Sequence, residues 1–116
     1  PSGHTWYVDE PLSKGGQDTA PNPIQLLLSA LGACTTVTLQ MYADHKDIKI
    51  EHIQVDLALN PAGDPEAGQN NIVRTITLKG DFTEEQYKRL LKVAESCPVH
   101  KLLTSNIQIQ TELSIK

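Results

Sequence analysis

Residues 22–34, Asn-Pro-Ile-Gln-Leu-Leu-Leu-Ser-Ala-Leu-Gly-Ala-Cys, decide how the rest of the chain must be arranged. Asn22 suits a helix N-cap and Pro23 suits the first helical position, which predicts a helix over residues 24–43. No charged residue occurs between Asp18 and Asp44, and this helix is apolar on nearly all sides. A helix of this kind in a globular domain lies in its middle and is covered on several faces.

The length of this segment also fits a helix that spans a membrane. Its polar side chains and the lack of a flanking basic cluster favour a buried helix of a globular domain instead; the polar residues are Gln25, Ser29, Thr35, Thr36, Thr38 and Gln40. A small sheet cannot cover such a helix alone. We therefore expect a second subunit to complete its burial.

The remaining elements follow from hydrophobic alternation, helical periodicity and capping signals. The predicted elements, in chain order, are strand 4–8, helix 24–43, strand 48–59, strand 72–80, helix 84–96, short helix 98–103 and strand 107–115. The long loop 60–71 makes the two middle strands a hairpin, so the sheet is antiparallel and the class is α+β.

Composition bounds the class of protein. The 116 residues fit a single domain, 1–116, and we expect residues to be missing before Pro1 because the chain does not begin with methionine. The net charge of −4, with Arg74 and Arg89 as the only arginines, argues against binding to nucleic acid or to anionic membranes. Two cysteines do not make a disulfide scaffold and are expected to be intracellular thiols.

Cys34 and Cys97 are the residues best suited to chemistry. Cys34 lies among apolar helical neighbours, which disfavour a thiolate, so taken alone it is better interpreted as a small buried hydrophobic residue. Cys97 precedes Pro98 at the start of a short helix, with His100 in the next turn, which favours a thiolate. Both cysteines face the same small core, as a redox pair, as two unrelated buried thiols or as a structural disulfide.

Two further features involve the neighbours of the cysteines. Cys97 and His100 have the spacing of a pair of metal ligands, but structural zinc sites usually show two such pairs, so no metal is expected. Arg74 falls on the apolar face of its strand and needs an anionic partner. That partner is a thiolate or a carboxylate, unless Arg74 is an inward-pointing charge on an edge strand.

The chain resembles the OsmC/Ohr family. The resemblance rests on Asp9-Glu10-Pro11, Gly15-Gly16 and Pro21-Asn22-Pro23 leading into the segment that ends at Cys34, and on Cys97-Pro98-Val99-His100. It implies antiparallel sheets around central helices in an intertwined homodimer, with the sites at the dimer interface. It also implies that Cys34 attacks the peroxide and Cys97 resolves the product, in the cytoplasm and without a cofactor.

The resemblance implies a thiol-dependent peroxidase. A hydroperoxide would enter an apolar pocket lined by Leu27, Leu31, Val37 and Met41, with His100 also binding substrate, and a lipoyl-type or small dithiol would reduce the Cys34–Cys97 disulfide. Ile24 stands where well-characterised members have a glutamate, and residues 1–23 contain no activating arginine. Arg74 is then the expected activator of Cys34. The alternative is a non-enzymatic protein that binds an apolar small molecule at the dimer interface.

Overall fold

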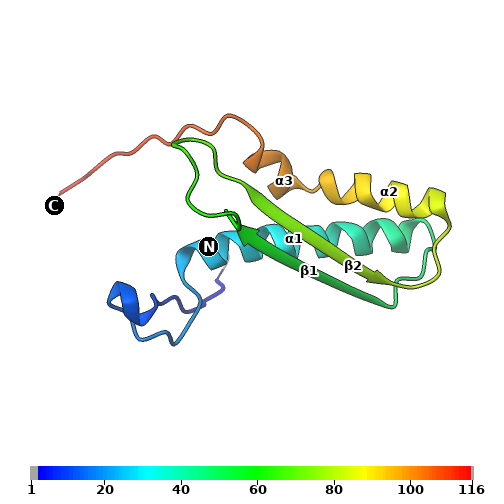
Figure 1. Cartoon of the computed structure of the whole chain (residues 1–116), viewed down its shortest axis with the longest axis horizontal. Coiled ribbons are helices and arrows are strands. Elements are labelled where there is room, and N and C mark those ends of the chain that lie inside the picture. The colour runs from blue at the N-terminus through cyan, green and yellow to red at the C-terminus, as the bar shows by residue number, and fades with distance from the viewer. Residues whose placement is uncertain (1–2, 116) are drawn as a thin grey trace.

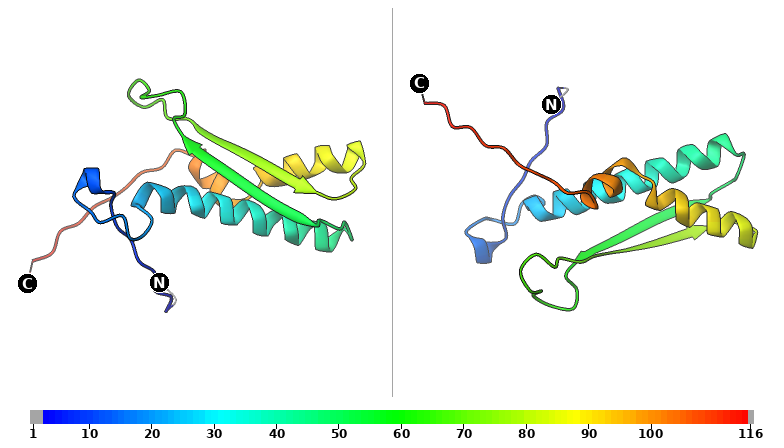
Figure 2. Two further views of the ribbon diagram at one scale, coloured as in Figure 1. Left: turned by 60° about the horizontal axis from the view of Figure 1, so that its bottom comes forward. Right: turned by 90° about the horizontal axis from the view of Figure 1, so that it is seen from above.

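The long helix α1 (Pro23–His45) runs through the middle of the structure, a computed structural model that describes residues 3–115. The hairpin of β1 (His52–Leu59) and β2 (Ile72–Lys79) lies along one side of it. Helices α2 (Glu84–Glu95) and α3 (Pro98–Leu103) lie along another side (Figures 1 and 2). A short 3-10 helix, η1 (Leu12–Lys14), precedes α1.

The predicted start of α1 is confirmed at Asn22. Its side chain accepts a hydrogen bond from the Gln25 backbone amide at 2.8 Å, and the Gln25 side-chain oxygen accepts one from the Asn22 backbone amide at 2.9 Å. This capping box satisfies two backbone donors that would otherwise lack partners, and Pro23 follows it with its φ already set for a helix. The start of α1, and with it the position of Cys34 along the helix, is therefore fixed by local sequence.

The hairpin brings Arg74 over α1. β1 and β2 are antiparallel, and Arg74 pairs with Leu57 across the ladder. β1 begins at His52, four residues later than the predicted start at 48, because residues 46–51 are needed to turn the chain away from α1. Alternation along β2 buries part of Ile72, Arg74 and Ile76 on the same face, as predicted.

The core lies where α1, α2 and the hairpin meet. Leu39, Leu90, Val93 and Ala94 form its buried centre, and half-buried side chains from both strands surround them. The hydrophobic stripe of α2 supplies three of the four residues. The core therefore holds the middle of α1 against α2, one turn away from Thr35.

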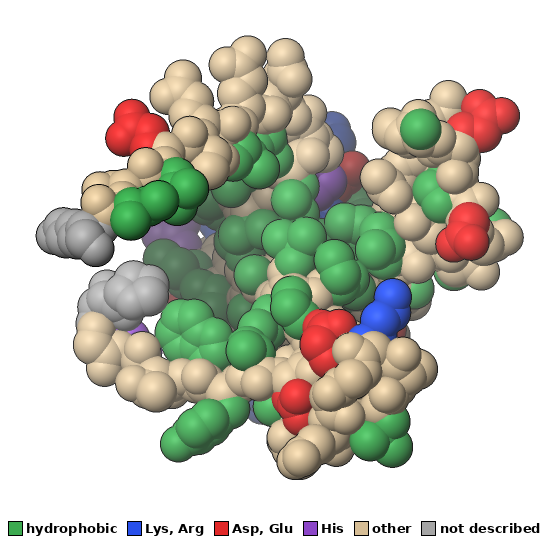
Figure 3. All heavy atoms as spheres, turned by 90° about the vertical axis from the view of Figure 1, so that its left-hand side faces the viewer, with side chains coloured by type: hydrophobic (Ala, Val, Ile, Leu, Met, Phe, Trp, Pro, Cys, Tyr) green, Lys and Arg blue, Asp and Glu red, His purple; other side chains and the backbone are tan. Residues whose placement is uncertain are grey.

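Much of α1 is not covered within the single chain. The helix is long and apolar enough to cross a membrane by length and composition, yet only 17% of its most hydrophobic stretch is buried. Apolar side chains gather at the centre of the face seen from the left-hand side of Figure 1, as Figure 3 shows. A large exposed apolar surface is typical of a face that contacts another protein.

The predicted strands 4–8 and 107–115 do not form within the described chain. Both segments are extended, and the sheet contains β1 and β2. In the C-terminal segment, Ile109, Leu113 and Ile115 are all more than 85% exposed. A strand needs a hydrogen-bonded neighbour, and the tail runs away from the hairpin edges (Figures 1 and 2), so the alternating pattern is present without a partner.

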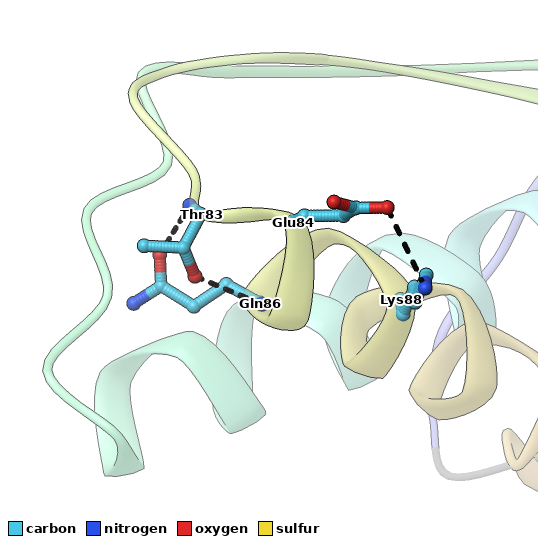
Figure 4. A network of polar contacts seen from close by, with 4 residues as sticks. All are labelled: Thr83, Glu84, Gln86 and Lys88. Atoms are coloured by element: carbon cyan, nitrogen blue, oxygen red, sulfur yellow. Dashed lines mark hydrogen bonds and ion pairs between the residues drawn. The ribbon is translucent and has the colours of Figure 1, made fainter.

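The start of α2 offers a test of local stability. Thr83 and Gln86 exchange hydrogen bonds of 3.0 and 3.1 Å in a second capping box (Figure 4). We expect Thr83→Ala to lower the free energy of unfolding by about 1 kcal/mol, measured by urea denaturation. Lys88→Ala, which removes an exposed ion pair with Glu84, is the matched control and should cost less than about 0.5 kcal/mol. Equal losses would contradict the capping role.

Candidate functional site

Arg74 connects three elements at one place. Its Nη1 donates a hydrogen bond to Thr35 Oγ1 on α1 at 3.0 Å, and its Nη2 contacts His100 Nδ1 on α3 at 2.9 Å. A guanidinium has donors only, so Nδ1 accepts and the proton of the neutral imidazole lies on Nε2. The strand, the central helix and the short helix are thus joined through one side chain.

Thr35 is the buried member of this network. Its side chain is fully buried, and its hydroxyl donates to the Leu31 carbonyl at 2.7 Å while it accepts from Arg74. A buried hydroxyl without partners would cost free energy, so both of its bonds stabilise the position of Arg74. Thr35 therefore places the guanidinium beside the cysteines.

Cys97 is the N-cap of α3 and is fully buried. Its sulfur accepts a hydrogen bond from the His100 amide at 3.3 Å. Burial opposes ionisation, but the His100 amide, the Cys34 thiol, the Thr35 hydroxyl and the charge of Arg74 together hold the pKa of Cys97 below its ordinary value. These contacts therefore favour the thiolate of Cys97 more than the surroundings of an ordinary cysteine do.

Cys34 lies beside Cys97 but is more accessible. Both cysteines are free thiols, Cys97 buried and Cys34 partly exposed. Cys34 is at the centre of an apolar stripe on α1 whose members follow at alternating spacings of three and four residues: Leu27, Ala30, Cys34, Val37 and Met41. An outside molecule can therefore reach Cys34 from this stripe, whereas Cys97 is covered.

A pocket of about 220 Å³ adjoins the network. Arg74 and His100 line it together with Asn70 and Thr104, and its apolar wall is formed by Leu31, Ile72 and Leu103. The pocket therefore combines the Arg74–His100 pair, a cation and a hydrogen-bonding group in contact, with apolar lining side chains.

The structure brings together five of the eight site residues that the sequence singled out: Cys34, Cys97, Arg74, His100 and Leu31. Leu27, Val37 and Met41 share the exposed stripe of α1 with Cys34 and do not line the pocket beside Arg74; their exposed fractions are 44%, 56% and 67%. Their role in binding substrate stays a prediction. Within residues 3–115, no cluster of three His, Cys, Asp or Glu side chains could hold a metal ion.

Sequence reasoning missed Thr35, although it adjoins Cys34. A threonine inside an apolar helix normally satisfies its hydroxyl on the preceding turn, as Thr36 also does with the Gly32 carbonyl at 3.0 Å. Nothing in the sequence separates Thr35 from Thr36. Only the register of β2 over α1 determines which of the two meets Arg74.

Substitution of Arg74 tests the electrostatics. Arg74→Met removes a cation that favours the thiolate, so the pKa of Cys97 should rise. The measurement is the ultraviolet absorbance of the thiolate against pH, in a Cys34→Ser background so that one thiol titrates. Arg89→Met is the matched control, because Arg89 lies over the Tyr42 ring on α1.

The same substitution should change how stability depends on pH. Folding lowers the pKa of Cys97, so the stabilisation is complete above the unfolded pKa and is lost as the pH falls through the folded pKa. Between these two values the wild-type free energy of unfolding should therefore rise more steeply with pH than that of Arg74→Met. Identical slopes and identical thiol titrations would show that Arg74 does not act on Cys97.

Comparisons with known proteins identify the family and the fold. A family model described as OsmC-like protein matches residues 15–112. An osmotic stress and detoxification response protein of Psychrobacter arcticus is similar in structure, with a TM-score of 0.68 and 21% identity, over 82% of this chain and 69% of that chain. An organic hydroperoxide resistance protein OsmC of Legionella pneumophila has a TM-score of 0.63 and 23% identity, over 84% of this chain and 72% of that chain. The organic hydroperoxide resistance protein OhrB of Bacillus subtilis has a TM-score of 0.55 and 28% identity, over 88% of this chain and 75% of that chain. No curated protein sequence matches the chain.

Proposed function

Because the chain belongs to the OsmC-like family, we propose that it is a thiol-dependent peroxidase that reduces organic hydroperoxides through Cys34 and Cys97. Family membership and neighbours named for organic hydroperoxide resistance support a peroxide-linked role in the stress response. The single observation that carries the proposal is the pairing of an accessible thiol, Cys34, with a buried thiol whose pKa is lowered, Cys97.

The two environments suit different steps. Cys34 can meet a hydroperoxide, because it is partly exposed in an apolar stripe. The Cys34 thiol lies beside the Cys97 sulfur, which can take its proton as Cys34 attacks the distal oxygen and pass it to the departing alkoxide, which leaves as an alcohol. Cys97 then attacks the Cys34 sulfenic acid, water leaves, and a disulfide forms. A dithiol restores both thiols by exchange.

Arg74 acts in this scheme through Cys97. Its charge and its bond to His100 favour a thiolate at Cys97, and the thiolate is both the proton acceptor and the resolving nucleophile. The sequence-based hypothesis had Arg74 act on Cys34 directly. The contacts of Arg74 favour the indirect route, in which Arg74 is a positioning residue.

The test is consumption of an organic hydroperoxide in the presence of a dithiol. We expect multiple turnovers with cumene hydroperoxide, and mass spectrometry should show loss of two hydrogens in the oxidised protein and a peptide that joins Cys34 to Cys97. No consumption of peroxide by the folded protein would favour the non-enzymatic alternative, for which Ile24, half exposed on the first turn of α1, is the relevant departure from the family pattern.

We also propose that the protein works as a soluble, cytoplasmic homodimer. The exposed apolar stripe of α1 and the unpaired C-terminal segment support this assembly, because a second copy offers a matching stripe and free sheet edges. In a dimer of this kind, Cys34 would lie at the subunit interface. The hydroperoxide would then enter between the subunits.

A further inference from the structure

Arg74 has more hydrogen-bond donors than its two bonds within the described chain use. Two of its five N–H groups are bonded, to Thr35 and to His100, and both partners are neutral. No carboxylate of residues 3–115 lies within 4 Å of its guanidinium. The side chain is only partly buried, so the remaining donors are open to an outside anion.

The pocket beside Arg74 restricts the kind of anion. Its volume of about 220 Å³ suits a small molecule, and Leu31, Ile72 and Leu103 present an apolar wall to it. Guanidinium groups match the geometry of carboxylates, with two parallel N–H···O bonds, and His100 and Asn70 add polar groups to the lining of the same pocket. A short chain that ends in a carboxylate fits this combination.

The redox state of Cys97 changes the charge that Arg74 experiences. In the reduced protein, Cys97 lies close enough to Arg74 for their charges to interact, so a negative charge on the Cys97 sulfur offsets that of Arg74 and disfavours binding of a second anion. In the disulfide form the Cys97 sulfur is neutral, and within the described residues no carboxylate takes its place. Arg74 is therefore a stronger anion-binding group after oxidation than before it.

We propose that Arg74 and His100 form a carboxylate-binding subsite that gains affinity when Cys97 loses its negative charge, and that its ligand is a small thiol reductant carrying a carboxylate. The identity of the ligand as a reductant rests on the proposed function, whereas the subsite itself does not. The subsite would hold the reductant next to the disulfide at the stage when reduction is needed.

Two molecules of the thiol reductant reduce the Cys34–Cys97 disulfide. The thiolate of the first reductant molecule attacks the accessible Cys34 sulfur, the Cys34–Cys97 bond breaks, and its electron pair goes to Cys97 beside Arg74. Cys97 is the better leaving group because its pKa is the lowered one. A second reductant thiolate then displaces Cys34 from the mixed disulfide. Two reductant thiols become one disulfide, and their two protons restore the two protein thiols.

The first experiment measures binding without any peroxide chemistry. Butanoate and its neutral isostere butanamide are titrated into the reduced wild type and into Cys97→Ser at mildly alkaline pH, with affinity read from NMR shifts. We expect butanoate to bind Cys97→Ser roughly fivefold or more tightly than the wild type, and butanamide to show no difference. Cys97→Ala replaces Cys97→Ser if the serine variant does not fold.

Arginine variants locate the site. Arg74→Met should abolish the preference for butanoate over butanamide, and Arg89→Met, which changes the only other arginine, should keep it. The subsite would be overturned if butanoate bound the Cys97 variant and the reduced wild type with equal affinity. It would also be overturned if Arg74→Met kept the preference for butanoate over butanamide. Tighter binding of butanoate to the reduced wild type than to the Cys97 variant would indicate that the subsite binds a carboxylate of the peroxide substrate. It would overturn the proposal that the ligand is a reductant.

The second experiment tests the reductant. The disulfide form is reduced with 3-mercaptopropionate and with 3-mercaptopropionamide, and the ratio of the two rates is compared between the wild type and Arg74→Met. We expect the carboxylate to be favoured in the wild type and the ratio to fall roughly fivefold or more in the variant. An unchanged ratio of the two rates in Arg74→Met would overturn the proposal that the ligand is a reductant. A protein that never forms the disulfide refutes the proposed function, and the butanoate result still decides the subsite.

Discussion

Cys34→Ser should lower turnover of an organic hydroperoxide at least about a thousandfold, because the serine hydroxyl cannot replace the attacking thiolate. Cys97→Ser should lower steady-state turnover to a similar extent for a different reason. It keeps Cys34 and can still consume about one equivalent of peroxide per chain, more slowly than the wild type because Cys97 no longer accepts the Cys34 proton, and the sulfenic acid then has no resolving partner. Rapid-mixing measurements of a single turnover separate the two variants.

The trapped product distinguishes these roles further. Dimedone should label Cys34 in Cys97→Ser after one equivalent of peroxide, and it should not label Cys97 in Cys34→Ser. Thermal unfolding of both variants serves as the control for intact folding. Labelling of Cys97 in the Cys34→Ser variant would reverse the assignment, making the buried cysteine the attacking one.

Met41→Glu should dissociate the proposed dimer. Met41 is 67% exposed in the single chain and belongs to the apolar stripe that contains Cys34. A carboxylate buried there by a second subunit, without a partner, should cost about 3 kcal/mol or more, a roughly hundredfold weakening of association. Sedimentation velocity over a dilution series measures it, and the wild type should stay dimeric on dilution.

Gln40→Glu is the matched control on the same helix. Gln40 is exposed next to Met41 in the sequence but faces Asp44, to which it donates a hydrogen bond of 2.8 Å. The added charge should cost no more than about 0.5 kcal/mol, from repulsion within the helix turn, and leave association unchanged. A folded wild-type monomer at low concentration would refute the dimer, whatever the variants do.

The elements with local signals were predicted almost to the residue. Asn22 with Gln25, and Thr83 with Gln86, fix two helix starts through short-range hydrogen bonds, and Pro98 fixes a third. The terminal strands had equally clear alternation and yet are unpaired in the described chain. An alternating sequence predicts that the two faces of a strand differ in polarity. It does not predict whether a neighbouring strand exists, because pairing depends on partners distant in sequence or in another chain.

The site was predicted in part, for a similar reason. Residue type and position identified Cys34, Cys97, Arg74 and His100. The sequence could not show that Arg74 bonds to Thr35 and His100, because that depends on how far β2 is displaced along α1. A displacement of one residue would turn Arg74 to the opposite face of the sheet. The contacts that give Arg74 its role are thus properties of packing.

The unpaired C-terminal segment has a consequence for how the protein is made in a cell. Once synthesised, it presents free backbone donors and acceptors together with alternating apolar side chains. Until a neighbouring chain arrives, that segment can pair with any exposed strand, including a copy of itself in a misfolded chain. Dilute synthesis therefore prolongs the vulnerable stage, and crowded synthesis makes wrong pairings more frequent. Yield of active protein should pass through a maximum at intermediate expression levels.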